Sequence, residues 1–418
     1  MRRRAYAAWT IPAAYAAGAV AIGMLLPRLE HRLWLDVVSS ISPSSATAIY
    51  STVAAGTLTL SAIVFSLTFV VVQFGATAYS PRLVLWLAQD PLTSHALGVF
   101  TGTFLYAIAA LAWIDRDNEN GVPIVSAVVV VLWLVASIAM FIALINRIGL
   151  LQVNRMLTFT GNQGRRVIAA VYPDTGPDAP EARGDDTDAP TQVIAYHGRP
   201  RTIQAIDGLS LVKLAHAADA RVEAAVAVGD TLMESTPLLR VFGAARPIDE
   251  QSLRAAITLG DQRTFEQDPQ YAIRLLVDIA IRALSPAIND PTTAVQALDE
   301  IGDLLIRLGR SSLTTAPLRD GAGVVRAVIP QPTWDDFVRL AFDEICSYGA
   351  TSAQVMRRMN ALLAELKAAV TPGRWSVLAH WQSRLESSIV RHFPDADERR
   401  DAAANDRQGF GVSRRPAA

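Results

Sequence analysis

Hydrophobic positions dominate the first third of the chain, where four long runs carry no charged residue. The runs cover residues 9–26, 46–74, 92–114 and 122–145. Each is close to or longer than the roughly 20 residues that a helix needs to cross the hydrocarbon core of a bilayer. We therefore expect a four-span α-helical membrane domain over residues 1–150. Because no Asp, Glu, Lys or Arg lies inside any run, a voltage sensor and a carboxylate proton relay are disfavoured.

The first run admits two interpretations, a cleaved signal peptide or a retained helix. The sequence MRRR at the start suits a signal peptide. However, the run is followed by GMLLPRLE, which lacks the small-residue pattern of a cleavage site. We expect the first helix to be retained.

Arginines near the ends of the runs predict the orientation in the membrane. With the N-terminus inside, the cytoplasmic set is Arg2, Arg3, Arg4, Arg82, Arg147, Arg155, Arg165 and Arg166. The outside set is smaller, with Arg28, Arg32 and Arg116. Cytoplasmic loops carry the excess of positive charge, so the N-terminus and everything after residue 145 are expected in the cytoplasm. The single cysteine, Cys346, agrees with a reducing compartment.

The second run has small and polar residues at helical spacing. One face of the predicted helix carries Thr52, Gly56, Thr59, Ser66 and Gln73. Small residues let helices approach each other closely, so helix packing is one interpretation. The other is that hydroxyl and amide groups line a polar path or a binding groove. Gln73 in particular requires a partner if it lies in hydrocarbon.

The third run contains a GxxxG spacing, with Gly98 and Gly102 in the sequence GVFTG. Such a spacing permits close helix approach. It marks these two glycines as candidate helix-packing residues, within one protomer or between two.

The remainder of the chain is expected to form an α+β region on the cytoplasmic side. Residues 151–192 read as a juxtamembrane segment followed by an acidic, Pro- and Asp-rich disordered linker. Residues 193–248 have short β-type runs separated by turns and predict a small β-rich module. Within it, VAVGDTLMESTPLLRV has the pattern strand, Gly229–Asp230 turn, strand, similar to lipoyl-like carrier modules but without a lysine in the turn. A structural role is therefore favoured over a swinging-arm carrier.

Helical periodicity takes over from residue 249 and predicts a helical bundle over residues 249–393. Thr333 and Asp336 have the spacing of a capping box, and TPGRW separates a last helix at about 374–393. The stretch RTFEQDP brings Arg263, Glu266 and Asp268 close together. We expect them to cap a helix that starts near Pro269, and we favour this role over a catalytic one. The tail, residues 394–418, is polar and is expected to be disordered.

The stretch RALSPAINDPTTAV, residues 282–295, separates two of these helical patterns. Pro286 ends the first helix near Leu284, and Asp290 before Pro291 is a typical start for the second. A helix corner explains these residues but leaves Asn289, Thr292 and Thr293 without a role. Together with Asp290 they form a candidate contact loop for an ion, a lipid headgroup or a neighbouring subunit.

Several classes of function lack support in the sequence. The chain has no phosphate-binding loop, no HExxH and no GxSxG motif, so no catalytic or cofactor-binding residue is assigned and no cofactor is expected. The six histidines are scattered without metal-ligand spacing. The formal net charge of −1 provides no basic field for nucleic acid.

Two long stretches, SLTFVVVQFGATAYSPRL and GDQRTFEQDPQYAIRLLVDIAIRALSPAINDPTTAVQALD, resemble the bacterial membrane-protein family catalogued as domain of unknown function 2254. The resemblance extends over nearly the whole chain, and ALSPAINDPTTA is its most distinctive element. It implies an integral inner-membrane protein with a cytoplasmic C-terminal half. It supplies no catalytic residues, since the family has no assigned activity.

Two functional hypotheses follow. The leading one is an oligomeric channel- or transport-like protein with a cytosolic regulatory domain, because four spans alone seldom enclose a path and a homo-oligomer would be needed. The alternative is a membrane-anchored sensor or scaffold, whose spans only anchor and oligomerise the cytosolic half. The expected partners are the lipid bilayer and further copies of the chain.

Overall fold

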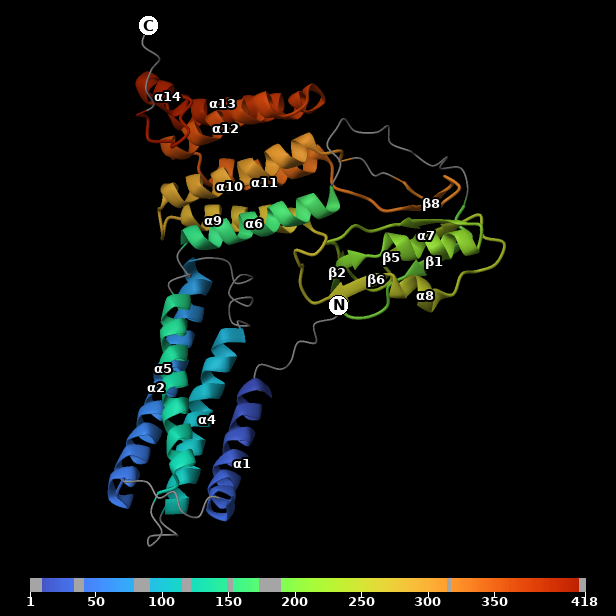
Figure 1. Cartoon of the computed structure of the whole chain (residues 1–418). Helices are drawn as coiled ribbons and strands as arrows, with labels where there is room; N and C mark the ends of the chain where they lie inside the picture. The colour runs from blue at the N-terminus through green and yellow to red at the C-terminus, as the bar shows by residue number, and fades with distance from the viewer. Residues whose placement is uncertain are drawn as a thin grey trace. The chain divides into compact units, whose positions relative to one another are not determined.

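The computed structural model describes residues 10–33, 41–78, 91–114, 122–148, 153–172, 189–313 and 317–412 (Figure 1). The chain divides into two compact units, Met1–Gln152 and Val153–Ala418, called here the membrane unit and the C-terminal unit. Five of the arginines from which the orientation in the membrane was predicted lie outside the described residues, namely Arg2, Arg3, Arg4, Arg82 and Arg116. So do most of the predicted linker, at residues 173–188, and the last six residues.

The membrane unit confirms the predicted four-span α-helical domain. Its helices are α1 (Thr10–Leu33), α2 (Pro43–Ala78), α4 (Pro91–Ile114) and α5 (Ile124–Ile148). Each contains a stretch long and apolar enough to cross a membrane. These stretches are Thr10–Glu30, Pro43–Val70, Leu92–Ile114 and Ile124–Asn146.

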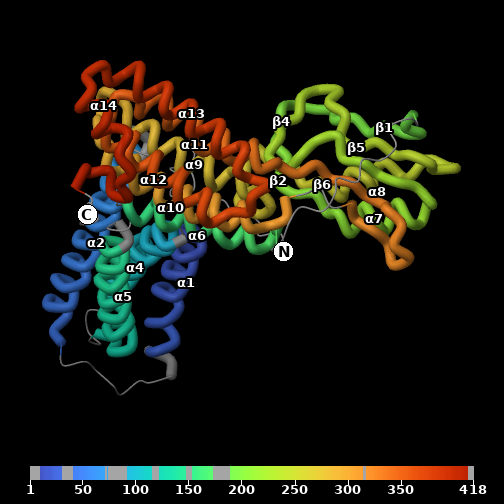
Figure 2. Tube along the Cα trace, turned by 90° about the horizontal axis from the view of Figure 1, so that it is seen from above, coloured from blue at the N-terminus to red at the C-terminus, as the bar shows by residue number. Residues whose placement is uncertain are grey.

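Helix α4 is the centre of the membrane unit. Within its most apolar window 50% of the residues are buried, against 17–22% for the other three helices. It packs against α1, α2 and α5, and both views place α1 and α2 on opposite sides of it (Figures 1 and 2). Phe100 and Tyr106 of α4 are fully buried. The outer helices therefore leave a large part of their surface free for lipid or for another chain.

The C-terminal unit contains two small sheets. The β-strands are β1 (Gln192–Ala195), β2 (Arg201–Ile206), β3 (Arg221–Ala224), β4 (Thr231–Leu232), β5 (Pro237–Phe242), β6 (Ile257–Gly260), β7 (Leu318–Arg319) and β8 (Val325–Val328). One sheet has the order β1-β5-β3-β8-β7 and the other the order β4-β2-β6. Only the β3–β8 pair is parallel among the described pairs, with Val222 opposite Ala327.

The strand pairing differs from the predicted hairpin around Gly229 and Asp230. The turn is present, with Gly229 at φ +94° and Asp230 accepting a hydrogen bond from the Ala227 amide. However, β4 after the turn pairs with β2, whereas β5 pairs with β1 and β3. Strands β6, β7 and β8 also lie outside the expected 193–248 range. Non-local pairing of this kind leaves no local signal in the sequence.

Two short helices accompany the sheets, α7 (Gly208–Ala217) and α8 (Glu250–Ala255). Helix α7 lies within residues 193–248, for which short β-type runs were expected. Asp207 and Asp249 cap them by accepting hydrogen bonds from the amides of Ser210 and Ser252. Leu211 of α7 and Leu253 of α8 are fully buried in the core formed with the strands.

The remaining helices stack in layers beside the sheets (Figure 1). They are α6 (Val153–Val171), α9 (Pro269–Ala283), α10 (Pro291–Arg310), α11 (Trp334–Tyr348), α12 (Ala353–Ala369), α13 (Trp375–His392) and α14 (Ala396–Ala402). Helix α10 contacts α6, α9, α11 and α12, and its Leu298, Ile301 and Leu305 are fully buried. The predicted capping box at Thr333 and Asp336 is confirmed, as is the last helix of the bundle.

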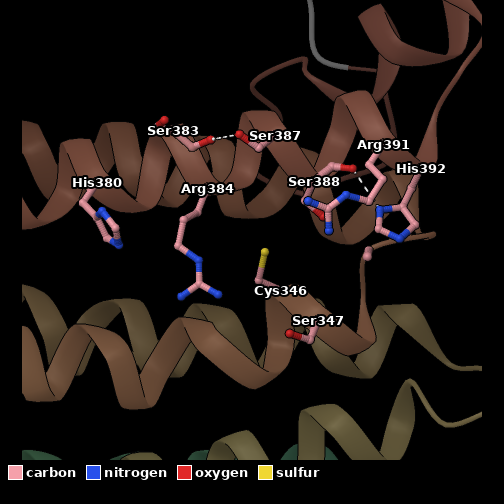
Figure 3. Close-up of a pocket in the computed structure, with 10 residues that line it drawn as sticks. Cys346, Ser347, His380, Ser383, Arg384, Ser387, Ser388, Arg391 and His392 are labelled. Carbon is pink, nitrogen blue, oxygen red and sulfur yellow. Dashed lines mark hydrogen bonds between the residues drawn. The ribbon is translucent and has the colours of Figure 1, made fainter.

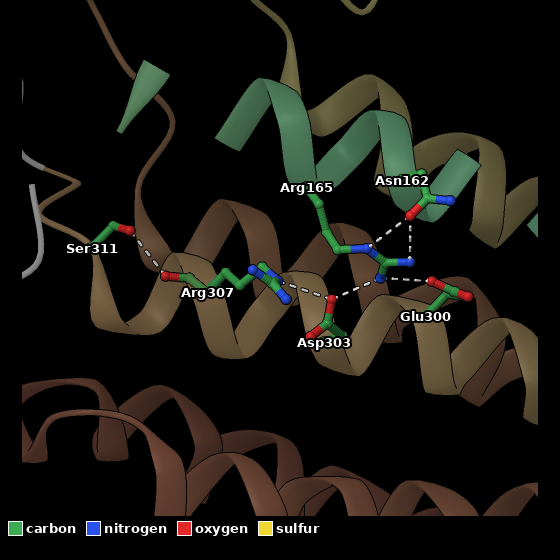
Figure 4. Close-up of polar contacts among 6 residues, drawn as sticks. All are labelled: Asn162, Arg165, Glu300, Asp303, Arg307 and Ser311. Atoms are coloured by element: carbon green, nitrogen blue, oxygen red, sulfur yellow. Dashed lines mark hydrogen bonds and ion pairs between the residues drawn. The ribbon is translucent and has the colours of Figure 1, made fainter. Parts of the chain in front are cut away.

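Helix α6 is held to α10 by close packing and by ion pairs. A Cβ at Gly164 would lie 2.6 Å from a Leu304 methyl carbon, so the two helices approach closely there. Arg165 of α6 contacts Glu300 at 2.9 Å and Asp303 at 2.7 Å, and Asp303 also accepts from Arg307 (Figure 4). The helix that follows the last span is therefore fixed to the centre of the C-terminal unit.

The tail expected to be disordered from Pro394 is instead ordered through residue 412. Asp395 caps α14, whose Ala402 is fully buried. Arg357 of α12 donates to the carbonyls of Asp401 and Gly409, and Asn360 donates to the carbonyl of Ala403. The polar composition suggested disorder, but the tail is bound through its backbone carbonyls, which composition does not report.

Candidate functional site

The small and polar face of α2 lies on the outside of the membrane unit. Thr52, Gly56, Thr59, Ser66 and Gln73 are all exposed in the single chain. A Cβ at Gly56 would meet no atom within 4 Å. The opposite face, with Val53, Thr57 and Val64, is buried against the other helices. The exposed face of α2 therefore lines no interior path within one membrane unit.

Hydroxyl groups on this face bond within their own helix. Thr52 donates to the Ala48 carbonyl at 2.7 Å and Thr59 to the Ala55 carbonyl at 2.9 Å. Such bonds satisfy the hydroxyl donor but leave the oxygen able to accept. At Thr52 and Thr59 the face is therefore compatible with hydrocarbon and with water.

A second polar group is mostly buried and combines one residue from each of the four described helices of the membrane unit. Glu30 of α1 accepts hydrogen bonds from the amides of Val125 and Ser126 at 2.7 and 3.2 Å. Tyr50 of α2 and Tyr106 of α4 lie nearby and are 3% and 0% exposed. We call Glu30, Tyr50, Tyr106 and Ser126 the four-helix cluster.

Glu30 acts as the N-terminal cap of α5, although it belongs to α1. The first amides of a helix have no intrahelical acceptor, and a carboxylate there also complements the helix dipole. The Tyr106 hydroxyl lies beside Ser126, and the buried Tyr50 hydroxyl has no hydrogen-bond partner among the described residues. These two hydroxyls and the carboxyl group of Glu30 form a polar spot inside the membrane unit.

Sequence reasoning missed this cluster because it ended the first span at residue 26. The candidate span runs to Glu30, past Pro27, and so includes Arg28 and Glu30. The expectation that no charged residue lies inside a span was therefore wrong for the first span. The signal available in the sequence was weak: a glutamate one turn after an apolar run does not reveal which amides it will cap.

The GxxxG glycines of α4 lie inside the membrane unit. A Cβ at Gly98 would lie 2.6 Å from the Tyr15 ring of α1, and one at Gly102 would lie 3.1 Å from the Trp133 ring of α5. Tyr15 also bonds His95 of α4 at 3.2 Å. The glycines therefore allow aromatic side chains of two neighbouring helices to approach the α4 backbone.

The candidate contact loop forms the corner between α9 and α10. Asp290 caps α10 by accepting from the Thr293 amide at 3.1 Å and the Thr293 hydroxyl at 2.6 Å. Thr292 accepts from Gln354 of α12 at 3.4 Å. Asn289 has φ +51°, a conformation that asparagine tolerates better than most residues. Three of the four side chains thus make a hydrogen bond within the chain, and the fourth residue, Asn289, has a backbone conformation that suits it, so a helix corner accounts for all four.

The acidic RTFEQDP stretch also has a structural role. Asp268 is 3% exposed, caps α9 and accepts two hydrogen bonds from Arg263 at 2.6 and 2.7 Å. Among the described residues, no group of three or more His, Cys, Asp or Glu side chains is placed to hold a metal ion.

Comparison with known proteins places the chain among membrane proteins without a described activity. An uncharacterised protein of Mycobacterium bovis is 24% identical over 410 residues, covering 94% of this chain and 78% of its own length. An uncharacterised protein of Mycobacterium tuberculosis has the same identity and coverage. No solved structure matches. Residues 6–365 match the family described as predicted membrane protein (DUF2254). The chain therefore belongs to the DUF2254 family of predicted membrane proteins.

Proposed function

We propose that the chain assembles in the bacterial inner membrane as a homo-oligomer with a channel- or transport-like activity. The exposed face of α2 lines a polar path shared between copies, and the C-terminal unit regulates it from the cytoplasm. The N-terminus lies on the same side, as the distribution of arginines favours. The solute is left open.

The position of the α2 face is the observation that carries the proposal. All five residues of the face are exposed in the single chain, whereas Thr57, two positions before Thr59, is buried. Polar side chains within a span typically face a bundle interior or a water-filled cavity. Because the interior of one membrane unit is occupied by side chains such as Phe100 and Leu144, a path requires several copies arranged around it.

The attachment of α6 supports a regulatory role for the C-terminal unit. Helix α6 follows the last span after residues 149–152 and is fixed to α10 through Arg165. A shift of α10 would therefore also move α6, the first described helix after the last span.

A membrane-anchored sensor remains the second candidate, favoured by the hydroxyl bonds on α2. Because Thr52 and Thr59 donate to carbonyls of their own helix, the face also tolerates lipid without any polar path. In that case the spans anchor the C-terminal unit and conduct nothing.

The first test is the oligomeric state of the full-length protein in lipid nanodiscs, measured by native mass spectrometry. A ring of three or more copies supports the proposal. A monomer, or a dimer whose association survives substitutions on α2, contradicts it and leaves the anchored sensor.

The second test measures conductance of the reconstituted protein in potassium chloride. Thr59→Val removes a hydroxyl from the exposed face at nearly constant volume, and we expect a changed conductance with an unchanged oligomeric state. Thr57→Val is the matched control, because Thr57 is 1% exposed and turned to the inside of the unit. Equal conductance of the wild type and both variants would contradict a path along α2.

A further inference from the structure

A groove between α11 and α13 of the C-terminal unit has a lining rich in hydrogen-bond donors (Figure 3). Its volume is about 410 Å³, within the range of small-molecule sites. Helix α13 contributes His380, Arg384 and Arg391 together with several serine residues, and α11 contributes Cys346 and Ser347. In Figure 3, His380 and Arg384 point from α13 toward α11.

The cationic groups of the groove are only partly neutralised by the protein. Arg384 pairs with Asp343 of α11 at 3.0 Å and lies 4.5 Å from the Trp381 ring centroid, which fixes its orientation. Arg391 is exposed and forms no ion pair with any described residue. No carboxylate lines the groove itself. A net positive charge is therefore left for an anion.

Helix geometry explains part of this arrangement without a ligand. Arg391 and His392 lie in the last turn of α13, where positive charge complements the helix dipole, and His392 bonds the Ser388 carbonyl at 2.9 Å. That explanation does not extend to His380 and Arg384, which lie two to three turns earlier. His380, Arg384, Ser387 and Arg391 follow one another at intervals of three or four residues, which puts donors along one face of the helix.

The thiol in the groove is not its reactive centre. Burial raises the pKa of Cys346, against the opposing influence of Arg384 and of a hydrogen bond with Ser388. At neutral pH the group is therefore a thiol, a poor nucleophile and a poor metal ligand. Binding rather than covalent chemistry is what the lining supports.

We propose that the groove between α11 and α13 binds a phosphate group, carried by a free anion or by a lipid headgroup, with Arg384 and Arg391 as its cationic contacts. Guanidinium groups bind phosphate oxygens through paired hydrogen bonds, and serine hydroxyls supply further donors. This inference stands independently of a path through the membrane.

The test uses the full-length protein in phosphatidylcholine nanodiscs. Pyrophosphate is titrated at constant ionic strength set with chloride, and binding is followed by calorimetry and by the shift in melting temperature. We expect saturable binding by the wild type. Arg391→Gln should weaken it about tenfold or more, as expected for loss of one charge-assisted contact. Because Arg391 forms no ion pair with the described residues, this variant is expected to fold normally.

Two comparisons complete the design. Arg384→Gln should also weaken binding, whereas Arg339→Gln, an exposed arginine of α11 paired with Asp336, should bind as the wild type does. Short-chain phosphatidylglycerol then competes with pyrophosphate. Tighter binding of the lipid identifies a headgroup site, and tighter binding of pyrophosphate identifies a site for free phosphate compounds. Equal weakening in Arg339→Gln, or no saturable binding at millimolar pyrophosphate, would overturn the proposal.

Discussion

At the scale of single residues, Glu30 is the side chain that joins α1 to the start of α5. It reaches from α1 to the amides of Val125 and Ser126 in the first turn of α5. Unlike in water, a lost partner within a bilayer is not replaced by solvent. Glu30 thus holds α1 and α5 together in a region where the sequence pattern predicts apolar contacts alone.

We expect Glu30→Ala to lower the free energy of unfolding by about 1–3 kcal/mol, the cost of leaving buried donors unsatisfied. Glu30→Gln retains a carbonyl acceptor and should recover part of the loss. Thermal unfolding in nanodiscs measures both. Equal stability of Glu30→Ala and the wild type would show that the α5 amides find other acceptors.

Asp303 gives a prediction about pH. Burial raises the pKa of this carboxyl, but hydrogen bonds from Arg307 and Arg165 outweigh burial and hold the pKa below its ordinary value. A lowered folded-state pKa contributes stability that is present above the unfolded pKa of about 4 and is lost as the pH falls through the folded pKa.

Asp303→Asn should therefore melt at a lower temperature than the wild type at neutral pH. The difference should shrink as the pH falls from about 4, the unfolded-state pKa, toward the lower folded-state pKa at which the wild-type carboxylate itself becomes protonated. Melting curves recorded between neutral and acidic pH test this. A difference that stays constant over the range would contradict it.

At the scale of elements, the sequence predicted the features that depend on residues close together in the chain, namely the spans and the helix caps. The four apolar runs became α1, α2, α4 and α5, and Asp268, Asp290 and Thr333 cap helices at the positions that their spacing indicated. The sequence did not predict which elements pack or pair with each other. The pairing of β4 with β2, the side of α2 that faces outward and the contact of Gly164 with α10 depend on residues far away along the chain.

The GxxxG spacing shows the same limit, since it marked Gly98 and Gly102 without identifying the neighbours. We expect Gly98→Ala to destabilise the membrane unit by about 1–3 kcal/mol, because its Cβ would overlap the Tyr15 ring. Gly18→Ala is the control. No atom lies within 4 Å of its added Cβ, and it should be neutral or stabilise α1 by up to about 1 kcal/mol. Matching effects of the two substitutions in thermal unfolding would contradict the assigned contact.

At the scale of the whole molecule, the matched family region ends at residue 365, but the packed C-terminal unit continues to residue 412. Helices α13 and α14 cover α12, and the segment from Pro394 supplies acceptors to Arg357 and Asn360. A chain cut at the end of the family match would lose this cover.

Removal of residues 394–418 should therefore lower the melting temperature of the C-terminal unit by roughly 2–12 °C, equivalent to about 1–3 kcal/mol in a domain of this size. Arg357→Ala, which leaves the tail in place but removes two of its contacts, should have a smaller effect in the same direction. Calorimetry of the full-length and shortened chains measures the change. An unchanged transition after truncation would show that the tail contributes no stability.

The cap that Glu30 places on α5 also bears on biosynthesis. Helix α1 leaves the ribosome long before α5, with two other spans in between. The amides at the start of α5 find their acceptor only if the first helix has stayed beside the growing assembly. Removal of α1 by a signal peptidase would take that acceptor away. The contact between the first and the last span is thus the last of these contacts to form during synthesis. We expect it to require that α1 is still attached to the nascent chain when α5 emerges.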